Sequence, residues 1–234
     1  MIEYLKVIKY DNKIRLGNQS DGGYVVADIP DYDCYISAGI GNDESFSTSV
    51  LEHFKIREAH AFDGTITSLP ENCPKNMNCY QLNIGPNQTK TTANLKRFIN
   101  NHNNIFLKMD IEGAEYPWLE TLSLDNLNKF KQIIIEFHSI NDDGLDISFD
   151  TKTKCAEKLS TTHYVIHAHG NNCCNTTELI PNVIEITYVR KDVIGKHISF
   201  NTTPLPIENL DYPNIEYKED IDLNFYPFVT TLDL

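Results

Sequence analysis

Acidic, amide and imidazole side chains directly follow several short apolar runs of this 234-residue chain. Carboxylates and imidazoles can act as acids, bases or metal ligands, and carboxylates and amides can also hold the hydroxyl groups of a ligand. The residues in these positions are Asp63, Asn83, Asp110, Glu112, Glu136 and His138. A site built from them requires a fold that brings the ends of these runs to one place.

The chain alternates between runs typical of buried strands and segments with helical spacing. The expected strands are residues 34–38, 59–63, 79–83, 105–110, 132–137, 164–167 and 183–189, and the expected helices are 44–54, 91–100, 118–127 and 149–159. Such alternation predicts an α/β fold with a doubly wound, mostly parallel sheet. The last two strands have no clear helix between them, so we expect an antiparallel pair at the sheet edge. Ligands bind such sheets beyond the carboxyl ends of the strands, where the polar residues stand.

Both ends of the chain are expected to pack on this sheet, within a single domain of residues 1–234. Residues 1–30 contain strand-like runs at 4–8 and 24–27 around a turn-rich segment, which predicts an N-terminal β ribbon. The core is expected over residues 31–190. Residues 191–234 are rich in Phe and Tyr. This indicates a tail packed on the domain or on the partner subunit of a homo-oligomer.

Composition excludes several classes of protein. The formal net charge of −13 argues against nucleic acid as a partner, because binding to a phosphate backbone requires a basic surface. The first residues lack a signal peptide, and no run of about 18 apolar residues predicts a membrane span. The six cysteines form no CxxC pair, so reduced thiols and a cytoplasmic location are expected. The adjacent Cys173 and Cys174 are only weak support for a soft-metal site.

A glycine-rich turn, Gly39-Ile40-Gly41, joins the first core strand to its helix. Glycine lets a ligand approach the backbone closely. A dinucleotide-binding fingerprint would continue to a third glycine, whereas Asp43 and Glu44 follow here. These carboxylates would repel a pyrophosphate and tolerate a cationic ligand, which argues against NAD. Asp63 has two interpretations: it binds ribose hydroxyls, or it caps the turn that follows it.

Residues 106–115, with the sequence FLKMDIEGAE, resemble the signature of the FkbM-like methyltransferases. Residues 15–24 are similar to an RxG…DGGY segment of related proteins, and the spacing from Gly39 through Asp63 and Asn83 to the signature is also similar. The resemblance covers residues 13–190. It departs at Ser37-Ala38, where many relatives have an acidic residue. Glu44 and Asp21 are the candidates to recognise the amino group of the cofactor instead.

The resemblance implies a Rossmann-like, seven-stranded class I methyltransferase fold with an antiparallel final strand, and S-adenosylmethionine as the cofactor. Asp63 would hold the ribose, and Asn83 with Ile84 would flank the adenine. The full set expected to contact the cofactor is Asp21, Gly22, Ala38, Gly39, Ile40, Gly41, Glu44, Asp63, Gly64, Asn83, Ile84, Asp110, Ile111 and Glu112.

Methylation of a hydroxyl requires that its oxygen lie opposite the sulfur and that a base or a metal raise its reactivity. By analogy with related sugar O-methyltransferases, Asp110, Glu136 and His138 are the candidate catalytic residues and the candidate ligands of a divalent metal, Mg²⁺ or Mn²⁺. His169, which shares a strand face with His167, is a further candidate base. The expected acceptor is a small hydroxyl compound such as a sugar or glycan.

Several alternatives stay open at this point. The chain could be a catalytically degenerate, cofactor-binding partner or scaffold, or a methyltransferase that acts on nucleic acid or protein. Glu112 and Glu115 could merely favour the start of the following helix through its dipole. His138 could be a hydrogen-bonded, partly buried histidine without a chemical role.

Overall fold

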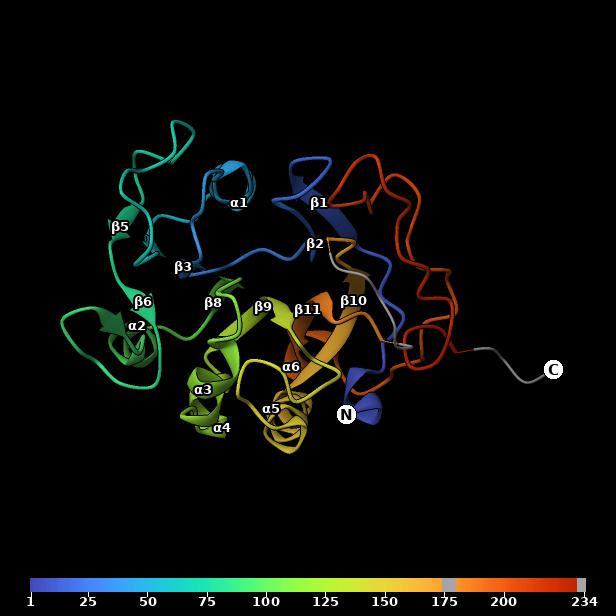
Figure 1. The fold of residues 1–234 in the computed structure, drawn as a ribbon. Helices are drawn as coiled ribbons and strands as arrows, with labels where there is room; N and C mark the ends of the chain where they lie inside the picture. The colour runs from blue at the N-terminus through green and yellow to red at the C-terminus, as the bar shows by residue number, and fades with distance from the viewer. Residues whose placement is uncertain (174–179, 231–234) are drawn as a thin grey trace.

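The computed structural model describes residues 1–173 and 180–230. Seven strands form the central sheet in the order β10-β11-β9-β8-β3-β4-β5 (Figure 1). Strands β3, β4, β5, β8 and β9 are parallel to one another, whereas β11 runs antiparallel between β9 and β10. The mixed α/β architecture predicted from the sequence is confirmed. The strand bounds are β3 Cys34–Ala38, β4 Ala59–Phe62, β5 Asn78–Tyr80, β8 Ile105–Met109, β9 Phe130–His138, β10 His163–Gly170 and β11 Val183–Arg190.

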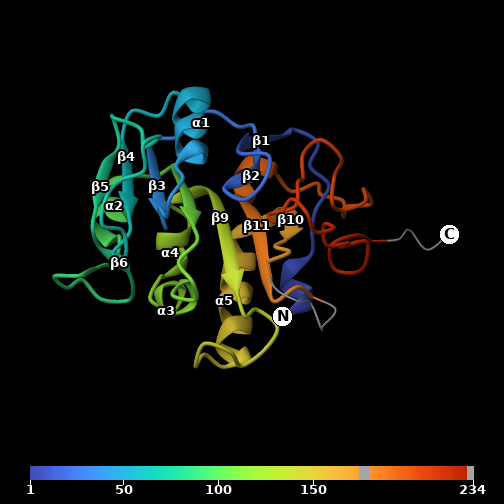
Figure 2. The ribbon, with the colours of Figure 1, turned by 45° about the horizontal axis from the view of Figure 1, so that its top comes forward.

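Different elements cover the two faces of the sheet (Figures 1 and 2). One face carries α2 (Lys96–Asn101), α3 (Glu115–Glu120), α4 (Leu124–Leu127) and α5 (Phe149–Thr162). The other carries α1 (Ser45–Phe54) and an antiparallel ribbon of β1 (Lys13–Gly17) and β2 (Gly23–Ala27). A short parallel pair, β6 (Asn83–Ile84) and β7 (Thr92–Ala93), lies outside the main sheet, and α6 (Lys191–Ile194) follows β11.

Alternating side chains divide the core into two apolar clusters, one on each face of the sheet. In β9, Ile133 and Ile135 belong to the cluster under the helices, and Ile134 belongs to the cluster under α1 and the ribbon. Apolar side chains on both faces are typical of a central strand, which explains why this run carries no polar alternation. The register also fixes which polar side chains meet at the sheet edges.

Three local predictions are wrong. Residues 4–8 do not form a strand: Ile2–Leu5 is a short 3-10 helix, and Val7 and Ile8 make only isolated bridges. The start of the predicted helix 91–100 is instead strand β7, because Thr92 and Ala93 pair with Asn83 and Ile84. The predicted helix 118–127 is two helices, because Ser123 forms a capping box that starts α4.

The ribbon and the tail also differ in detail from the expected boundaries. Strand β1 takes in residues 15–17, which the sequence predicts as part of a turn. The tail after α6 runs along the outer side of β10 (Figure 1) and buries Leu205, Leu223 and Phe228 completely. Within residues 1–173 and 180–230, no helix has the length and apolar character needed to cross a membrane. Cys174, one of the two adjacent thiols considered as a soft-metal site, lies outside the described residues.

Candidate active site

A cleft at the carboxyl ends of the parallel strands collects most of the residues that the sequence predicts as cofactor contacts. A cavity of about 320 Å³ there is lined by β6 and by segments that follow β3, β4 and β8. Its lining includes Gly39, Asp63, Asn83, Ile84, Asp110, Ile111 and Glu112. A second cavity of about 260 Å³ shares Gly39, Asp63, Asp110 and Glu112 with the first and extends to Asp21, Gly22, Ile40, Gly41 and Lys108. The two cavities therefore adjoin across the ends of β3, β4 and β8.

Glycine at position 39 brings the end of β3 against the loop after β8. Gly39 has a φ of 88°, and a Cβ atom there would lie 1.8 Å from the carbonyl oxygen of Asp110. The Asp110 N–H donates to the carbonyl of Ala38 at 2.9 Å, which continues the sheet pairing to this point. Only glycine fits this close approach.

The Asp63 carboxylate links the glycine-rich turn to the loop after β4. Its Oδ2 accepts hydrogen bonds from the N–H groups of Ile40 at 3.0 Å and Gly41 at 3.1 Å, and its Oδ1 accepts from the N–H and the hydroxyl of Thr65 at 2.7 and 2.6 Å. Burial opposes ionisation of Asp63, but these donors outweigh it and lower the pKa. The turn amides therefore point at a carboxylate of the protein and are not free to bind a pyrophosphate.

His138 lies among four carboxylates and is almost buried, with 13% of its side chain exposed. Its Nδ1 is 3.1 Å from Glu115 Oε1. Its Nε2 is 3.3 Å from Glu112, 3.7 Å from Glu136 and 3.9 Å from Asp110. Burial lowers the pKa of His138, but Glu115 and then the other carboxylates outweigh it and raise the pKa to about 9.

Buried neighbours hold His138 in place. The Glu115 side chain has no exposed surface, and its Oε1 also accepts a hydrogen bond from the N–H of Ile111 at 3.2 Å. The Tyr116 hydroxyl donates to the His138 carbonyl at 2.9 Å. The buried ammonium of Lys152 donates to the carbonyls of three residues in the loop after β9. These contacts fix both the ring and the loop that follows it.

A candidate metal group forms in the same place, and its members differ from the predicted set by one residue. One ligand atom each from Asp110, Glu112 and His138 lies within 4.8 Å of the others. Glu136 was predicted in place of Glu112, but it is buried and accepts a hydrogen bond from Asn171 at 2.9 Å. Burial and then the charges of Asp110 and Glu185 raise its pKa well above the usual value.

A family model, described as the methyltransferase FkbM domain, matches residues 6–153. This is more than half of the chain. The chain belongs to the FkbM methyltransferase family. The resemblance seen in residues 106–115 is thereby confirmed, and the protein is a methyltransferase. No curated protein matches the chain significantly.

Lys108 of the FkbM signature has a position in the cleft that the sequence does not reveal. Its ammonium donates to the carbonyl of Gly39 at 2.8 Å and lies 3.7 Å from the Asp110 carboxylate. It also lies 5.7 Å from the centre of the Tyr24 ring in the ribbon. Lys108 thus ties the glycine-rich turn, the loop after β8 and the ribbon together. Its place in the family signature is the one feature of the sequence that could have marked Lys108 as a site residue.

Three predicted cofactor contacts of the FkbM domain line neither cavity. Ala38 is fully buried within β3. Glu44 is buried and accepts a hydrogen bond from the Ser37 hydroxyl at 3.4 Å, behind the glycine-rich turn. Gly64 lies against Asn83, since a Cβ there would be 2.4 Å from the Asn83 side chain. Of the two candidates for the cofactor amino group, only Asp21 faces the cleft.

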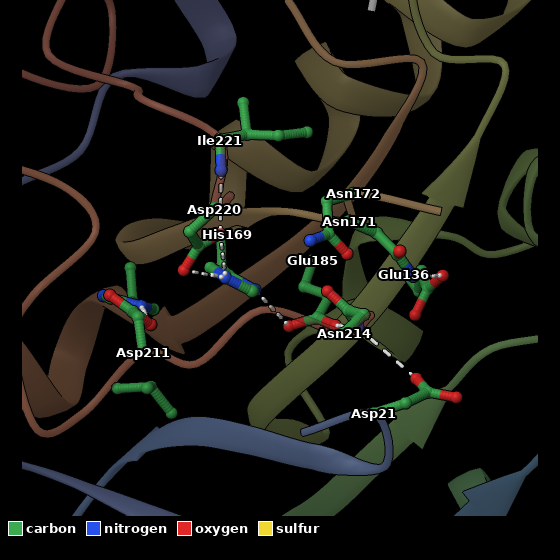
Figure 3. A network of polar contacts seen from close by, with 12 residues as sticks. Asp21, Glu136, His169, Asn171, Asn172, Glu185, Asp211, Asn214, Asp220 and Ile221 are labelled. Atoms are coloured by element: carbon green, nitrogen blue, oxygen red, sulfur yellow. Dashed lines mark hydrogen bonds and ion pairs between the residues drawn. The ribbon is translucent and has the colours of Figure 1, made fainter. Parts of the chain in front are cut away.

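His169 lies in a different environment from His138 and outside the matched FkbM region. Its Nδ1 is 3.1 Å from Glu185 and its Nε2 is 3.0 Å from Asp220 of the tail (Figure 3). Burial lowers its pKa, but Glu185 and Asp220 outweigh it and raise the pKa to about 10. Asn214 of the tail donates to Glu185 at 2.8 Å and to Asp21 at 3.3 Å. This network anchors the tail to β10, β11 and the ribbon.

A wider groove of about 740 Å³ lies at the opposite end of the sheet, near Asn104, Asn128 and Arg190. It contains none of the residues predicted to bind cofactor or metal. Lys108, Asp110 and Glu112 of the family signature therefore line the two adjoining cavities at the carboxyl ends of the strands and not this groove.

Proposed function

We propose that this FkbM methyltransferase transfers a methyl group from S-adenosylmethionine to a hydroxyl oxygen of a small acceptor such as a sugar or glycan. The observation that carries the proposal is that a cavity suited to the cofactor and a group of acid–base side chains lie next to each other in one cleft. The cavity around Asp63 and the glycine-rich turn adjoins the group formed by Asp110, Glu112 and His138. A binding site for the methyl donor beside acid–base and metal-binding side chains is what hydroxyl methylation requires.

The lining of the cleft fits this cofactor, which supplies an electrophilic methyl group on a positively charged sulfur. Carboxylates of Asp21, Asp63 and Asp110 suit a ligand with positive charge. Ile84 and Ile111 offer apolar surface for an adenine ring. The amides of the glycine-rich turn are occupied by Asp63, so the donor set does not fit a dinucleotide pyrophosphate. The sheet order and the antiparallel β11 support a Rossmann-like class I methyltransferase fold.

We infer that Asp110, Glu112 and His138 would hold a divalent cation, Mg²⁺ or Mn²⁺. Two carboxylates and one imidazole are suitable ligands for Mn²⁺, and the carboxylates for Mg²⁺. Such a cation would supply the positive charge that lowers the pKa of an acceptor hydroxyl. His138 would bind through Nε2, which faces Asp110 and Glu112, while Nδ1 remains on Glu115. Glu115 would thereby set the orientation of the ring.

Calorimetry with S-adenosylmethionine and S-adenosylhomocysteine tests the donor half of the proposal, and mass spectrometry of a sugar panel tests the acceptor half. We expect saturable binding of both compounds and a methylated sugar whose formation stops on treatment with a chelator. Absence of binding at saturating cofactor would refute the proposal. Binding without turnover on any acceptor, with Mg²⁺ or Mn²⁺ present, would favour a cofactor-binding partner protein instead.

A further inference from the structure

A cysteine, a glutamate and two histidines meet at the end of the sheet opposite the cleft. Cys34 begins β3, and Glu58 and His60 lie at the start of β4, which pairs with β3 in parallel register. His102 follows the last residue of α2. One ligand atom each from Cys34, Glu58 and His60 lies within 4.8 Å of the others. These residues lie at the amino ends of the parallel strands, where Cys34 pairs with Ile105, whereas Asp110 lies at the carboxyl end of β8. The proposed methyl transfer does not use them.

Both imidazoles turn the same nitrogen toward Glu58. His60 Nε2 is 3.0 Å from one carboxylate oxygen, and His102 Nε2 is 3.3 Å from the other. The opposite nitrogens have partners of their own, since His60 Nδ1 lies 3.3 Å from the Tyr80 hydroxyl and His102 Nδ1 lies 2.9 Å from the Phe98 carbonyl. Histidine ligands of metals typically have such an outer partner, which fixes the ring.

Burial gives the cluster an enclosed inner side and an open outer side. Cys34 is fully buried, and its thiol donates a long hydrogen bond of 3.7 Å to the Tyr35 carbonyl. The side chains of His60 and His102 are 8% and 12% exposed, whereas that of Glu58 is 47% exposed. The cluster is therefore open to solvent at Glu58 and enclosed at Cys34.

We propose that Cys34, Glu58 and His60 bind a zinc-type transition-metal ion, with His102 as the fourth ligand. Ligand atoms of a tetrahedral zinc site lie about 3.5 Å apart, given bonds of about 2.0–2.3 Å. The ligand atoms of Cys34, Glu58 and His60, which lie within 4.8 Å of one another, thus need to draw together by about 1 Å. His102 lies outside this group of three but has its Nε2 3.3 Å from Glu58, so it would have to turn toward the ion together with the exposed Glu58 side chain. Thiolate and imidazole ligands select zinc over Mg²⁺.

The proposed ion would join three segments that are separate in sequence: β3, β4 and the end of α2. Gly39 and Asp63 in the cleft directly follow the same two strands, so the ion would hold the opposite ends of these strands together. Binding to the folded chain alone raises its stability by mass action. We therefore expect the melting temperature of the full chain to rise with Zn²⁺ and to fall back with a chelator.

Cobalt substitution tests the site directly, because Co²⁺ reports a tetrahedral thiolate environment in its absorption spectrum. The full chain titrated with Co²⁺ is expected to show a thiolate-to-cobalt charge-transfer band and tetrahedral d–d bands, both lost on addition of Zn²⁺. The Cys34→Ser variant is expected to show neither. Absence of these bands in the wild type, or their persistence in Cys34→Ser, would overturn the proposal.

Control variants separate this site from other candidate ligands. Cys73 and Cys79 have their sulfur atoms 3.5 Å apart, so a Cys73→Ser/Cys79→Ser variant must keep the cobalt bands. Asp110→Asn, in the cleft, must keep them as well. Loss of the bands in either control, with Cys34 intact and the circular dichroism unchanged, would place the cobalt elsewhere and overturn the proposal.

Substitutions of the outer ligands guard against misfolding of the buried Cys34 variant. Glu58→Gln and His102→Gln are each expected to weaken Co²⁺ and Zn²⁺ binding by about tenfold or more while the far-ultraviolet circular dichroism stays unchanged. Unchanged affinity in both variants would overturn the four-ligand site. This outcome is independent of the methyltransferase assays, which depend on the other end of the sheet.

Discussion

Asp63 offers the sharpest test of the cleft, because a single carboxylate accepts four hydrogen bonds there. The Asp63→Ala substitution would remove all four. A hydrogen bond to a charged group contributes a net of about 1.5–3 kcal/mol, but the site is partly open and water can replace some of these bonds. We therefore expect the free energy of unfolding to fall by about 2–3 kcal/mol. If Asp63 also holds the ribose, cofactor affinity should fall by at least about tenfold, or about 1.4 kcal/mol.

Calorimetry with S-adenosylhomocysteine measures the affinity, and urea unfolding of the same preparations measures the stability. Thr65→Ala is the matched control, since it removes one hydrogen bond to Oδ1 and leaves the carboxylate in place. We expect its affinity to change by less than about fivefold. Wild-type affinity in Asp63→Ala would refute the ribose assignment. An equal loss in Thr65→Ala would mean that Asp63 acts only by holding the loop.

Three further predictions test other parts of the argument. His138→Ala should leave S-adenosylhomocysteine binding within about twofold of wild type but abolish methyl transfer, because the ring is a member of the candidate metal group. Retained turnover would exclude His138 from the chemistry. Gly39→Ala should lower the free energy of unfolding by about 2 kcal/mol or more and abolish cofactor binding. Gly41 has a φ of 58° and open space around its Cβ position, so Gly41→Ala should lower the free energy of unfolding by only about 1 kcal/mol. Similar losses for the two variants in urea unfolding would contradict the argument that Gly39 permits a close approach of the backbone. Burial lowers the pKa of His163 to about 4. Between pH 7 and 5 the unfolded chain therefore binds a proton at His163 that the folded chain does not bind, and the free energy of unfolding should fall by about 2 kcal/mol for this reason. His163→Gln should lose that part of the pH dependence in urea unfolding, and an unchanged pH profile would count against the assignment to His163.

Most strands of the sheet could be predicted because each carries its own signal. The predicted strand 79–83 is an exception, because β5 ends at Tyr80 and Asn83 belongs to β6, outside the main sheet. A run such as β9 is apolar on both faces, and the pattern is contained within nine residues. The elements that were predicted wrongly depend on residues elsewhere. Thr92 and Ala93 leave the expected helix because they pair with Asn83 and Ile84. Leu5, Val7 and Ile8 belong to the apolar core, but of these only Val7 and Ile8 bridge to other segments.

The candidate site shows the same division between local and distant causes. Asp110 follows β8, and His138 ends the adjacent parallel strand β9, so the strand-end rule brings them together without further information. The sequence does not distinguish Glu112 from Glu136 as the third member. Glu112 reaches His138 because the backbone there turns through φ values of 56° at Glu112 and 101° at Gly113. Glu136 also lies near His138, at 3.7 Å from its Nε2, but it is buried and the same carboxylate oxygen accepts a hydrogen bond from Asn171, which follows β10.

The row of polar residues across the carboxyl edge explains why His169 resembles a catalytic residue in the sequence. The register places His169 beside Glu185, and Glu185 beside Glu136, so all three belong to one row that continues toward Asp110. At the Asp110 end the row borders the cavities, whereas at the His169 end Asp220 and Asn214 of the tail cover it. Strand alternation reveals the shared face but not the cover. The tail therefore divides one continuous polar row into an exposed part available for chemistry and a buried part that anchors the chain.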